Sequence, residues 1–342
     1  MSVSERQESA SGDSLALKRS RLLARKISEL ALVIEGTRIE ELIKQLYEEL
    51  ESAGISLRPR VYLSDEWGCP DRVPAIGIPF YLADPELQQL EGELSGVEAE
   101  NEAEVMLYLR HEMGHAFNYA YRLYAKPEWR QLFGKFSRPY QEDYKASPFS
   151  PRFVQHIPGW YAQKHPDEDF AETFAVWLTP GSRWREKYAG TPALAKLLYV
   201  ERVVRRYGRQ PPTVSDEGVD TPLQELTMTL DEWYKSYQDA DGGPALPPTI
   251  DDDLRSLFPG MEGQPAADVL EAHRWLLIRE IFHWTAMDRH TVGLMLNELL
   301  QRARFLDLKL EAAEVTPRMM GVSIFVTTLA MNYQRSSKFT EV

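Results

Sequence analysis

The stretch His111-Glu112-Met113-Gly114-His115 places two histidines four positions apart, with a glutamate directly after the first. Residues four apart on a helix project from the same face. The two imidazoles can therefore reach one metal ion, at the roughly 2.0–2.1 Å that zinc–nitrogen bonds have. Glu112 is then placed to act as a general base toward water at that ion.

The helix that carries this motif is expected to cover residues 101–124 and to be buried. It has apolar residues on more than one face, which is typical of a buried helix: Val105, Met106, Leu109, Met113, Ala116, Phe117 and Ala120. A glycine in mid-helix costs about 1 kcal/mol relative to alanine. We therefore expect a neighbouring element to pack closely against Gly114, beside the metal.

A catalytic zinc ion needs three protein ligands and one open position, so a third ligand is expected downstream. The segment HPDEDFAETFAVW, residues 165–177, supplies Glu168 and Glu172 on one face of a helix predicted over 166–178. Glu168 is predicted to bind the metal. Glu172 is predicted to accept a hydrogen bond from a ligand imidazole and fix its orientation. Asp167 and Asp169 are predicted to serve only the positive end of the helix.

The two motifs together resemble the gluzincin metallopeptidases, with Glu168 53 positions after His115. They resemble more closely the short-spaced gluzincins typified by the anthrax lethal factor catalytic domain. In that group the Glu ligand opens an E-x-x-A-E-x-F stretch, and residues 168–174 read EDFAETF. That group also has a catalytic tyrosine seven residues before the ligand, an offset at which this chain has Tyr161.

Longer stretches, including AIGIPFYLA (75–83), LRHEMGHAFNYAYRL (109–123) and HPDEDFAETFAVWLTP (165–180), resemble a bacterial family described as "putative zinc-binding metallopeptidases". The resemblance runs from about residue 22 to the C-terminal helices, and it implies zinc and hydrolysis without naming a substrate. With the motifs, it gives one zinc ion per chain on His111, His115 and Glu168. Tyr161 would donate to the oxyanion. His156 and His165 are alternatives for that role.

The periodicity predicts an α+β fold that is predominantly helical, with a small sheet in the first part and a helical C-terminal region. The resemblance implies that the first part is a gluzincin-like zinc peptidase domain. We expect strands at Arg58–Leu63 and Ala75–Leu82, and helices at 15–34, 38–53, 84–95, 192–207, 221–238, 249–257, 266–284, 289–305 and 316–334. The expected division is a disordered tail over 1–14, a peptidase domain over 15–210, a linker over 211–220 and the helical region over 221–342.

The composition limits the possible binding partners of the protein and the cellular compartment in which it is expected. A net charge of −13 argues against nucleic acid or an anionic membrane as the main partner. The single cysteine, Cys69, allows neither an internal disulfide nor a cysteine-based zinc site. The polar start of the chain and the lack of a long apolar run favour a cytoplasmic location. Cys69, His273, His283 and His290 are expected to be packing or solvated residues.

Two segments are candidates for contact with a peptide or protein substrate. Pro74 and Pro79 confine the strand over 75–82 to a sheet edge, where an extended peptide could pair beside Ile76 and Ile78. Residues 126–163 show no clear periodicity, and a loop this long is usually functional.

Residues 126–164 carry seven basic and three acidic side chains within an acidic chain. Arg138, Lys145 and Arg152 are therefore candidates for a basic rim that attracts an acidic peptide. The alternative is a scattered, solvated face.

Two other functions stay open at this stage. One is a zinc-fold protein that binds a peptide without cutting it, and the other is a zinc hydrolase of non-peptide amides. Retention of Glu112 argues against the first, because a binding protein has no need of a general base.

Overall fold

The computed structural model describes residues 17–95, 100–140, 146–214, 218–239, 246, 249–260, 262–285, 287 and 289–336. Most of these residues are helical, and the described strands pair as two small sheets, which agrees with the predicted predominantly helical α+β class. No described helix is both long and apolar enough to cross a lipid bilayer.

The first part of the chain holds most of the elements that the periodicity predicts. Its longer elements are α2 (Arg38–Ser52), β1 (Arg60–Ser64), β2 (Ala75–Pro79), α3 (Pro85–Ser95), α4 (Glu102–Ala120), α5 (Pro127–Phe133), α6 (Pro166–Leu178), α7 (Trp184–Lys187) and α8 (Pro192–Tyr207). Short 3-10 turns are η1 (Ile27–Glu29), η2 (Phe80–Ala83), η3 (Leu123–Ala125) and η4 (Tyr161–Gln163).

Some predicted bounds were wrong. The helix predicted over 15–34 is a short helical stretch at 17–23 followed by η1. The strand predicted over 75–82 ends at Pro79 and continues as η2. The segment 126–163, predicted to lack regular structure, contains α5, which Pro127 opens at its first helical turn.

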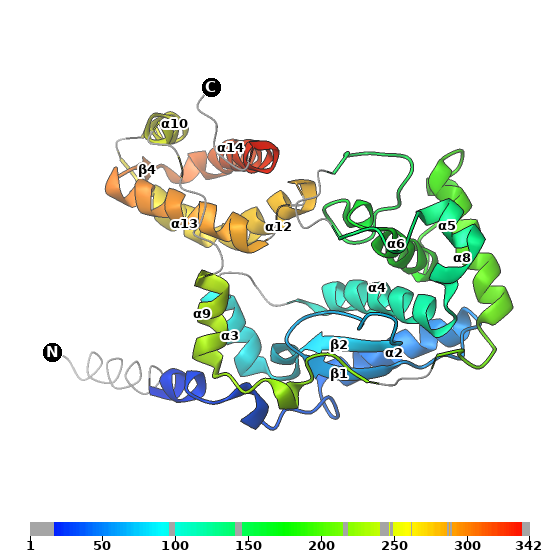
Figure 1. Cartoon of the computed structure of the whole chain (residues 1–342). Helices are drawn as coiled ribbons and strands as arrows, with labels where there is room; N and C mark the ends of the chain where they lie inside the picture. The colour runs from blue at the N-terminus through cyan, green and yellow to red at the C-terminus, as the bar shows by residue number, and fades with distance from the viewer. Residues whose placement is uncertain are drawn as a thin grey trace.

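Helix α4 lies at the centre of this part, between α6 on one side and the layer of β2 and α2 on the other (Figure 1). Its start is fixed by Asn101, whose side chain accepts from the N–H groups of Ala103 and Glu104. Apolar side chains of α2, β2, α4, α6 and α8 form one continuous core around it. The all-round apolar pattern of the motif helix is explained by this central position.

Strands β1 and β2 pair in parallel, with Arg60 opposite Ala75 and Ser64 opposite Pro79. The other edge of β2 is partly occupied, because Gly77 exchanges both backbone hydrogen bonds with Gly68. The turn that follows β1 therefore folds back onto β2.

The last part of the chain contains η5 (Leu223–Glu225), α9 (Leu230–Asp239), α10 (Ile250–Leu257), β3 (Gln264–Pro265), α11 (Ala266–Ala272), α12 (Arg274–Thr285), α13 (Arg289–Phe305), β4 (Lys309–Leu310), η6 (Ala312–Glu314) and α14 (Val315–Ser336). The single helix predicted over 266–284 is two helices that meet at His273. The two-residue strands β3 and β4 pair antiparallel and were not predicted.

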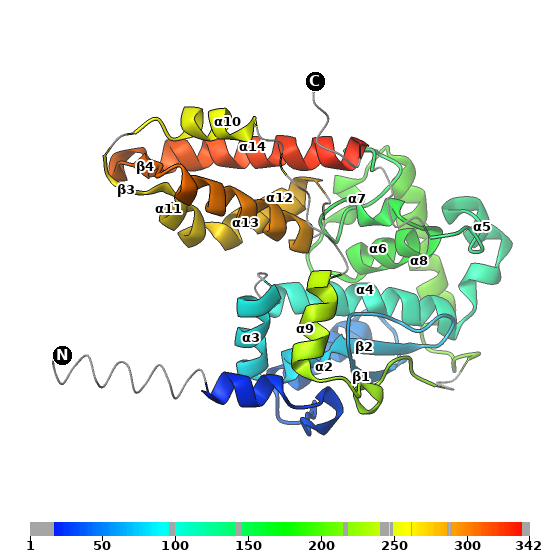
Figure 2. The same cartoon turned by 60° about the vertical axis from the view of Figure 1, so that its left-hand side comes forward.

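Helices α10 to α14 gather around their own apolar core (Figure 2). Helix α9 instead packs with η1, η2 and α3, and the centroid of the Trp233 ring lies 5.1 Å from that of Phe80 in η2. Arg289 at the start of α13 bonds Glu104 of α4 at 2.9 Å. The division into domains at 210 and 220 stays a prediction.

Candidate metal centre

Helices α4 and α6 approach each other closely at Gly114. A Cβ atom on this residue would lie 2.7 Å from the Cα of Ala171 and 2.9 Å from its carbonyl oxygen. Any larger side chain would push the helices apart, so the predicted close approach at Gly114 is confirmed. The contact brings the histidine-bearing turns of α4 against the first turns of α6.

Three side-chain donor atoms converge between these helices. The Nε2 atoms of His111 and His115 are 3.1 Å apart, and Oε2 of Glu168 lies 2.9 Å from the first and 3.2 Å from the second. All three residues are buried. The three residues predicted as metal ligands are thus brought together in a geometry that could hold a metal ion.

Each imidazole is oriented by a carboxylate on its far side. Nδ1 of His111 lies 3.0 Å from Oε1 of Glu172, and Nδ1 of His115 lies 2.9 Å from Oδ2 of Asp167. An ionised carboxylate only accepts hydrogen bonds, so each Nδ1 is assigned the proton. Both Nε2 lone pairs then point at the same place, as in carboxylate–histidine–zinc arrangements.

The carboxylate of Glu172 is itself held by the backbone. The N–H groups of His156 and Ile157 donate to it at 2.8–3.1 Å. The segment before η4 therefore fixes the group that orients His111. Glu172 lies where the spacing predicted it.

The carboxylate of Asp167 has an equivalent role that the sequence did not predict. It accepts from Asn118 Nδ2 at 2.7 Å and from the Tyr119 hydroxyl at 2.5 Å, besides His115. The expectation that it serves only the helix end was wrong. Asp169 also does more, since it pairs with the buried ammonium of Lys196 at 2.6 Å.

The chemistry of this donor set fits a cation. Two neutral imidazole nitrogens and a carboxylate oxygen are all acceptors, and without a positive charge between them they would repel one another. Burial lowers the pKa of His111, but hydrogen bonds to Glu168 and Glu172 outweigh it and raise that pKa to about 9. Burial likewise opposes a charged His115, yet Asp167 and Glu168 hold its pKa well above the ordinary value.

Glu112 lies in the same buried region and its carboxylate has no hydrogen-bond partner among the described residues. Burial raises its pKa, and the positive charges of His111 and His115 oppose the rise. A carboxylate that is desolvated and unengaged is available to accept a proton.

Of the residues proposed for the oxyanion, Tyr161 has a ring contact with His111. Its ring stands edge to face with that of His111, with 5.6 Å between the centroids. Nε2 of His156 bonds the carbonyl of Leu107 at 2.9 Å. His165 accepts from the N–H of Asp167 and bonds the carbonyl of Arg138 at 2.7 Å. Both histidines thus have structural hydrogen bonds to the backbone.

A second tyrosine near the centre was missed at the level of sequence. The hydroxyl of Tyr140 donates to Oε1 of Glu168 at 2.7 Å. It lies in the segment between α5 and η4, which has no periodicity that could single out one residue.

The structure contradicts two of the predicted substrate contacts. Ile76 and Ile78 are 0% exposed and belong to the core, so their assignment as substrate contacts was wrong. The residue between them, Gly77, already pairs with Gly68. Arg138 and Arg152 are exposed, as a basic rim requires, and Lys145 lies outside the described residues.

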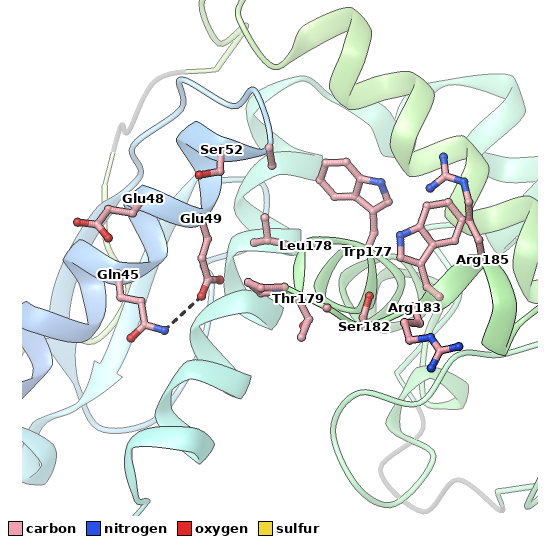
Figure 3. A pocket seen from close by; sticks show the side chains of 14 residues that line it. Gln45, Glu48, Glu49, Ser52, Trp177, Leu178, Thr179, Ser182, Arg183 and Arg185 are labelled. Atoms are coloured by element: carbon pink, nitrogen blue, oxygen red, sulfur yellow. Dashed lines mark hydrogen bonds between the residues drawn. The ribbon is translucent and has the colours of Figure 1, made fainter.

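A pocket of about 750 Å³ lies at the opposite end of α6. Figure 3 shows Glu49 of α2 directed toward Leu178 and Thr179 at the end of α6, whereas Glu48 points away from them. Glu168 lies in the first turn of the same helix, nine positions before Trp177, so a rise of 1.5 Å per residue places them about 14 Å apart along the helix axis. Glu49 is already paired with Arg110 at 2.8 Å. The pocket is therefore a separate feature from the metal centre.

Comparison with known proteins agrees with the geometry over part of the chain. Neither a curated protein nor a solved structure matches it. Residues 98–183 match the model of a family described as "Putative zinc-binding metallo-peptidase". The matched segment contains α4, α6 and all three converging donors, and the match and the buried cluster together support zinc as the metal.

Proposed function

We propose that this chain is a zinc-dependent metallopeptidase of gluzincin type, with zinc held by His111, His115 and Glu168. The observation that carries the proposal is the buried convergence of three acceptor atoms within 3.2 Å of one another. The family match over 98–183 supports it, as does the carboxylate behind each imidazole. The gluzincin type and a catalytic core similar to that of anthrax lethal factor are both part of this proposal.

Held by His111, His115 and Glu168, zinc would supply Lewis acidity toward the scissile carbonyl and would lower the pKa of water toward about 7. Glu112 takes the proton from the attacking water and later passes it to the leaving amine. Its carboxylate is buried beside both histidines, which places it close to the proposed zinc-bound water.

Tyr161 would donate its hydroxyl to the negative charge that develops on the carbonyl oxygen. Its ring lies beside His111, and the Lys164 ammonium lies 5.6 Å from the ring centroid on the same segment. His156 and His165 are weaker candidates, since their rings bond backbone carbonyls.

The substrate is proposed to be a peptide or protein, with acidic sequences favoured by the exposed Arg138 and Arg152. A non-catalytic peptide-binding protein and a hydrolase of non-peptide amides are the alternatives. The presence of Glu112 argues against the binding protein, because a protein that only binds a peptide has no need of a general base.

The test compares Glu112→Gln with Glu102→Gln, an exposed glutamate in the first turn of the same helix. The purified full-length variants are incubated with denatured cell proteins, and new peptide termini are counted by mass spectrometry. Glu112→Gln should keep its zinc and lose roughly 10²–10⁴ in rate, because the amide cannot accept the proton. Glu102→Gln should cleave like the wild type.

Near-normal cleavage by Glu112→Gln would refute this assignment of the base. Bound zinc without any new termini in the wild type would favour the binding protein. Hydrolysis of simple amides without peptide cleavage would favour the second alternative.

A further inference from the structure

Tyr140 is anchored to the end of the helix that carries Glu168. Its ring stacks on that of His165, with 4.1 Å between the centroids and 12° between the planes. His165 is the N-cap of α6 and accepts from the N–H of Asp167, while its other ring nitrogen bonds the carbonyl of Arg138. The position of the tyrosine ring is therefore tied to the first turn of α6.

The two oxygens of Glu168 have different neighbours. Oε2 faces the Nε2 atoms of His111 and His115 at 2.9 and 3.2 Å. Oε1 accepts from the Tyr140 hydroxyl at 2.7 Å, and Tyr140 is its one donor within the part of the chain that the structure describes. A hydrogen bond to an ionised carboxylate is stronger than one between neutral groups.

We propose that Tyr140 is a positioning residue that holds Glu168 so that a single oxygen, Oε2, faces the metal. The inference rests on the proposed metal role of Glu168. A carboxylate can turn about its terminal bond and offer both oxygens, which would use the open position that a catalytic zinc site needs. The bond to Oε1 opposes that rotation and keeps the position open for water.

The exposure of Tyr140 makes a purely structural role a poor explanation. The residue is 46% exposed, so its ring adds little to the core, yet its hydroxyl reaches a carboxylate that is buried. A surface tyrosine that only covers the segment would not need its hydroxyl. Tyr140→Phe therefore separates the two explanations, because phenylalanine keeps the stacking on His165 and loses only the donor.

The experiment measures zinc affinity by competition with a chelator of known affinity, and records the visible absorption spectrum after replacement of zinc by Co²⁺. The matched control is Tyr47→Phe, which removes a hydroxyl bonded to the Pro59 carbonyl at 3.0 Å, away from the centre. Loss of an outer partner of a metal ligand typically weakens metal binding about 10–100-fold. We expect that loss and an altered Co²⁺ spectrum for Tyr140→Phe, and neither for Tyr47→Phe.

Wild-type zinc affinity together with a wild-type Co²⁺ spectrum in Tyr140→Phe would overturn the inference. A metal-free Tyr140→Phe that melts at the temperature of the metal-free wild type would support it, since the loss would then be confined to metal binding. Glu168→Ala serves as the reference. If Glu168→Ala keeps wild-type zinc affinity, the proposed function fails as well; if only Tyr140→Phe behaves like the wild type, the proposed function stands and this inference fails.

Discussion

The α4–α6 pair and the α10–α14 unit are both helical, but they bury different chemistry. Between α4 and α6 the buried side chains include His111, Glu112, His115, Asp167, Glu168, Asp169 and Glu172. Among the described residues of α10–α14, the buried ionisable group is Arg274, surrounded by a core of aliphatic side chains. Removing charges from water is costly, so a dense cluster of them is expected where chemistry requires it.

The cost of that burial is visible behind the metal centre. Burial raises the pKa of Asp169 to about 7, even though the ammonium of Lys196 lies 2.6 Å away and opposes the rise. The Lys196 ammonium also donates to the carbonyl of Arg152, in the segment that leads to His156. Helix α8 therefore supports α6 and the segment holding Glu172 through one buried ion pair. Such a pair is weak support for stability but is damaging to break.

The largest expected difference between the two regions comes from replacing one histidine in each of them by alanine. His111→Ala should abolish stoichiometric zinc binding, because a site with two remaining ligands is no longer a three-ligand zinc site. His283→Ala on α12, whose ring contacts Trp284, should keep all of its zinc. Metal analysis of both purified variants provides the measurement. A His111→Ala variant that keeps all of its zinc would contradict the assignment of His111 as a ligand. Loss of zinc from His283→Ala would show that the effect is not specific to the α4–α6 pair.

The next effect concerns a hydroxyl in each region. Tyr161→Phe should lower kcat by roughly 10²–10³ with little change in KM, because the donor meets charge that exists only in the transition state. Tyr333→Phe, at a tyrosine packed against the C-terminal core, should leave both constants unchanged. Steady-state kinetics on one cleaved peptide measures both variants. If KM rises in Tyr161→Phe while kcat holds, Tyr161 is a substrate contact instead.

The third effect is a pH dependence that only the α4–α6 pair should show. In the metal-free protein the pKa of His111 is raised to about 9, so its imidazole is protonated at pH 7. Zinc needs the neutral imidazole, so loading must release that proton. Zinc affinity should then rise with pH by up to about tenfold per pH unit for each proton released, from neutral pH to at least about pH 9, since the pKa of His115 is raised as well.

Calorimetry of zinc binding in buffers with different ionisation enthalpies measures the number of protons released. His283→Ala serves as the control, because it removes an imidazole on α12 and should release as many protons on zinc binding as the wild type. Zinc binding at pH 7 without proton release would show that the imidazoles are already neutral in the metal-free protein.

The sequence predicted the centre better than its surroundings, for a physical reason. The spacing of His111, His115, Glu168 and Glu172 follows from helix geometry, which is fixed by the chain itself. Gly114 could be interpreted in the same way, since a glycine in mid-helix has a cost that a close contact can explain. The bounds of α6 also follow from local signals, with Pro166 at its start and Thr179-Pro180-Gly181 at its end.

The features that were wrongly predicted or missed depend on how segments of the chain fold back in space. The seven residues of α5 are too short for a helical period to stand out in a window of about 11–18 residues. The edge of β2 is met by Gly68, whose approach depends on the turn after β1. Asp167 and Tyr140 reach the centre through the rotation of α6 and the path of a non-periodic segment. None of these positions is set by a local pattern.

The smallest expected effect concerns the basic rim. Arg138 and Arg152 are exposed, so their charges act on a substrate through solvent, where salt screens them. Replacing both by glutamine should lower kcat/KM for acidic peptides a few-fold and leave neutral peptides nearly unchanged, with a difference that fades as salt rises. The matched control is Arg205→Gln with Arg304→Gln, two exposed arginines on α8 and α13 that change the net charge equally. If only the net charge of the protein matters, kcat/KM for acidic peptides should fall equally in both double variants. If a local basic rim attracts the substrate, kcat/KM should fall only when Arg138 and Arg152 are replaced. Equal effects on acidic and neutral peptides, or a rate independent of salt, would mean that Arg138 and Arg152 belong to a solvated face.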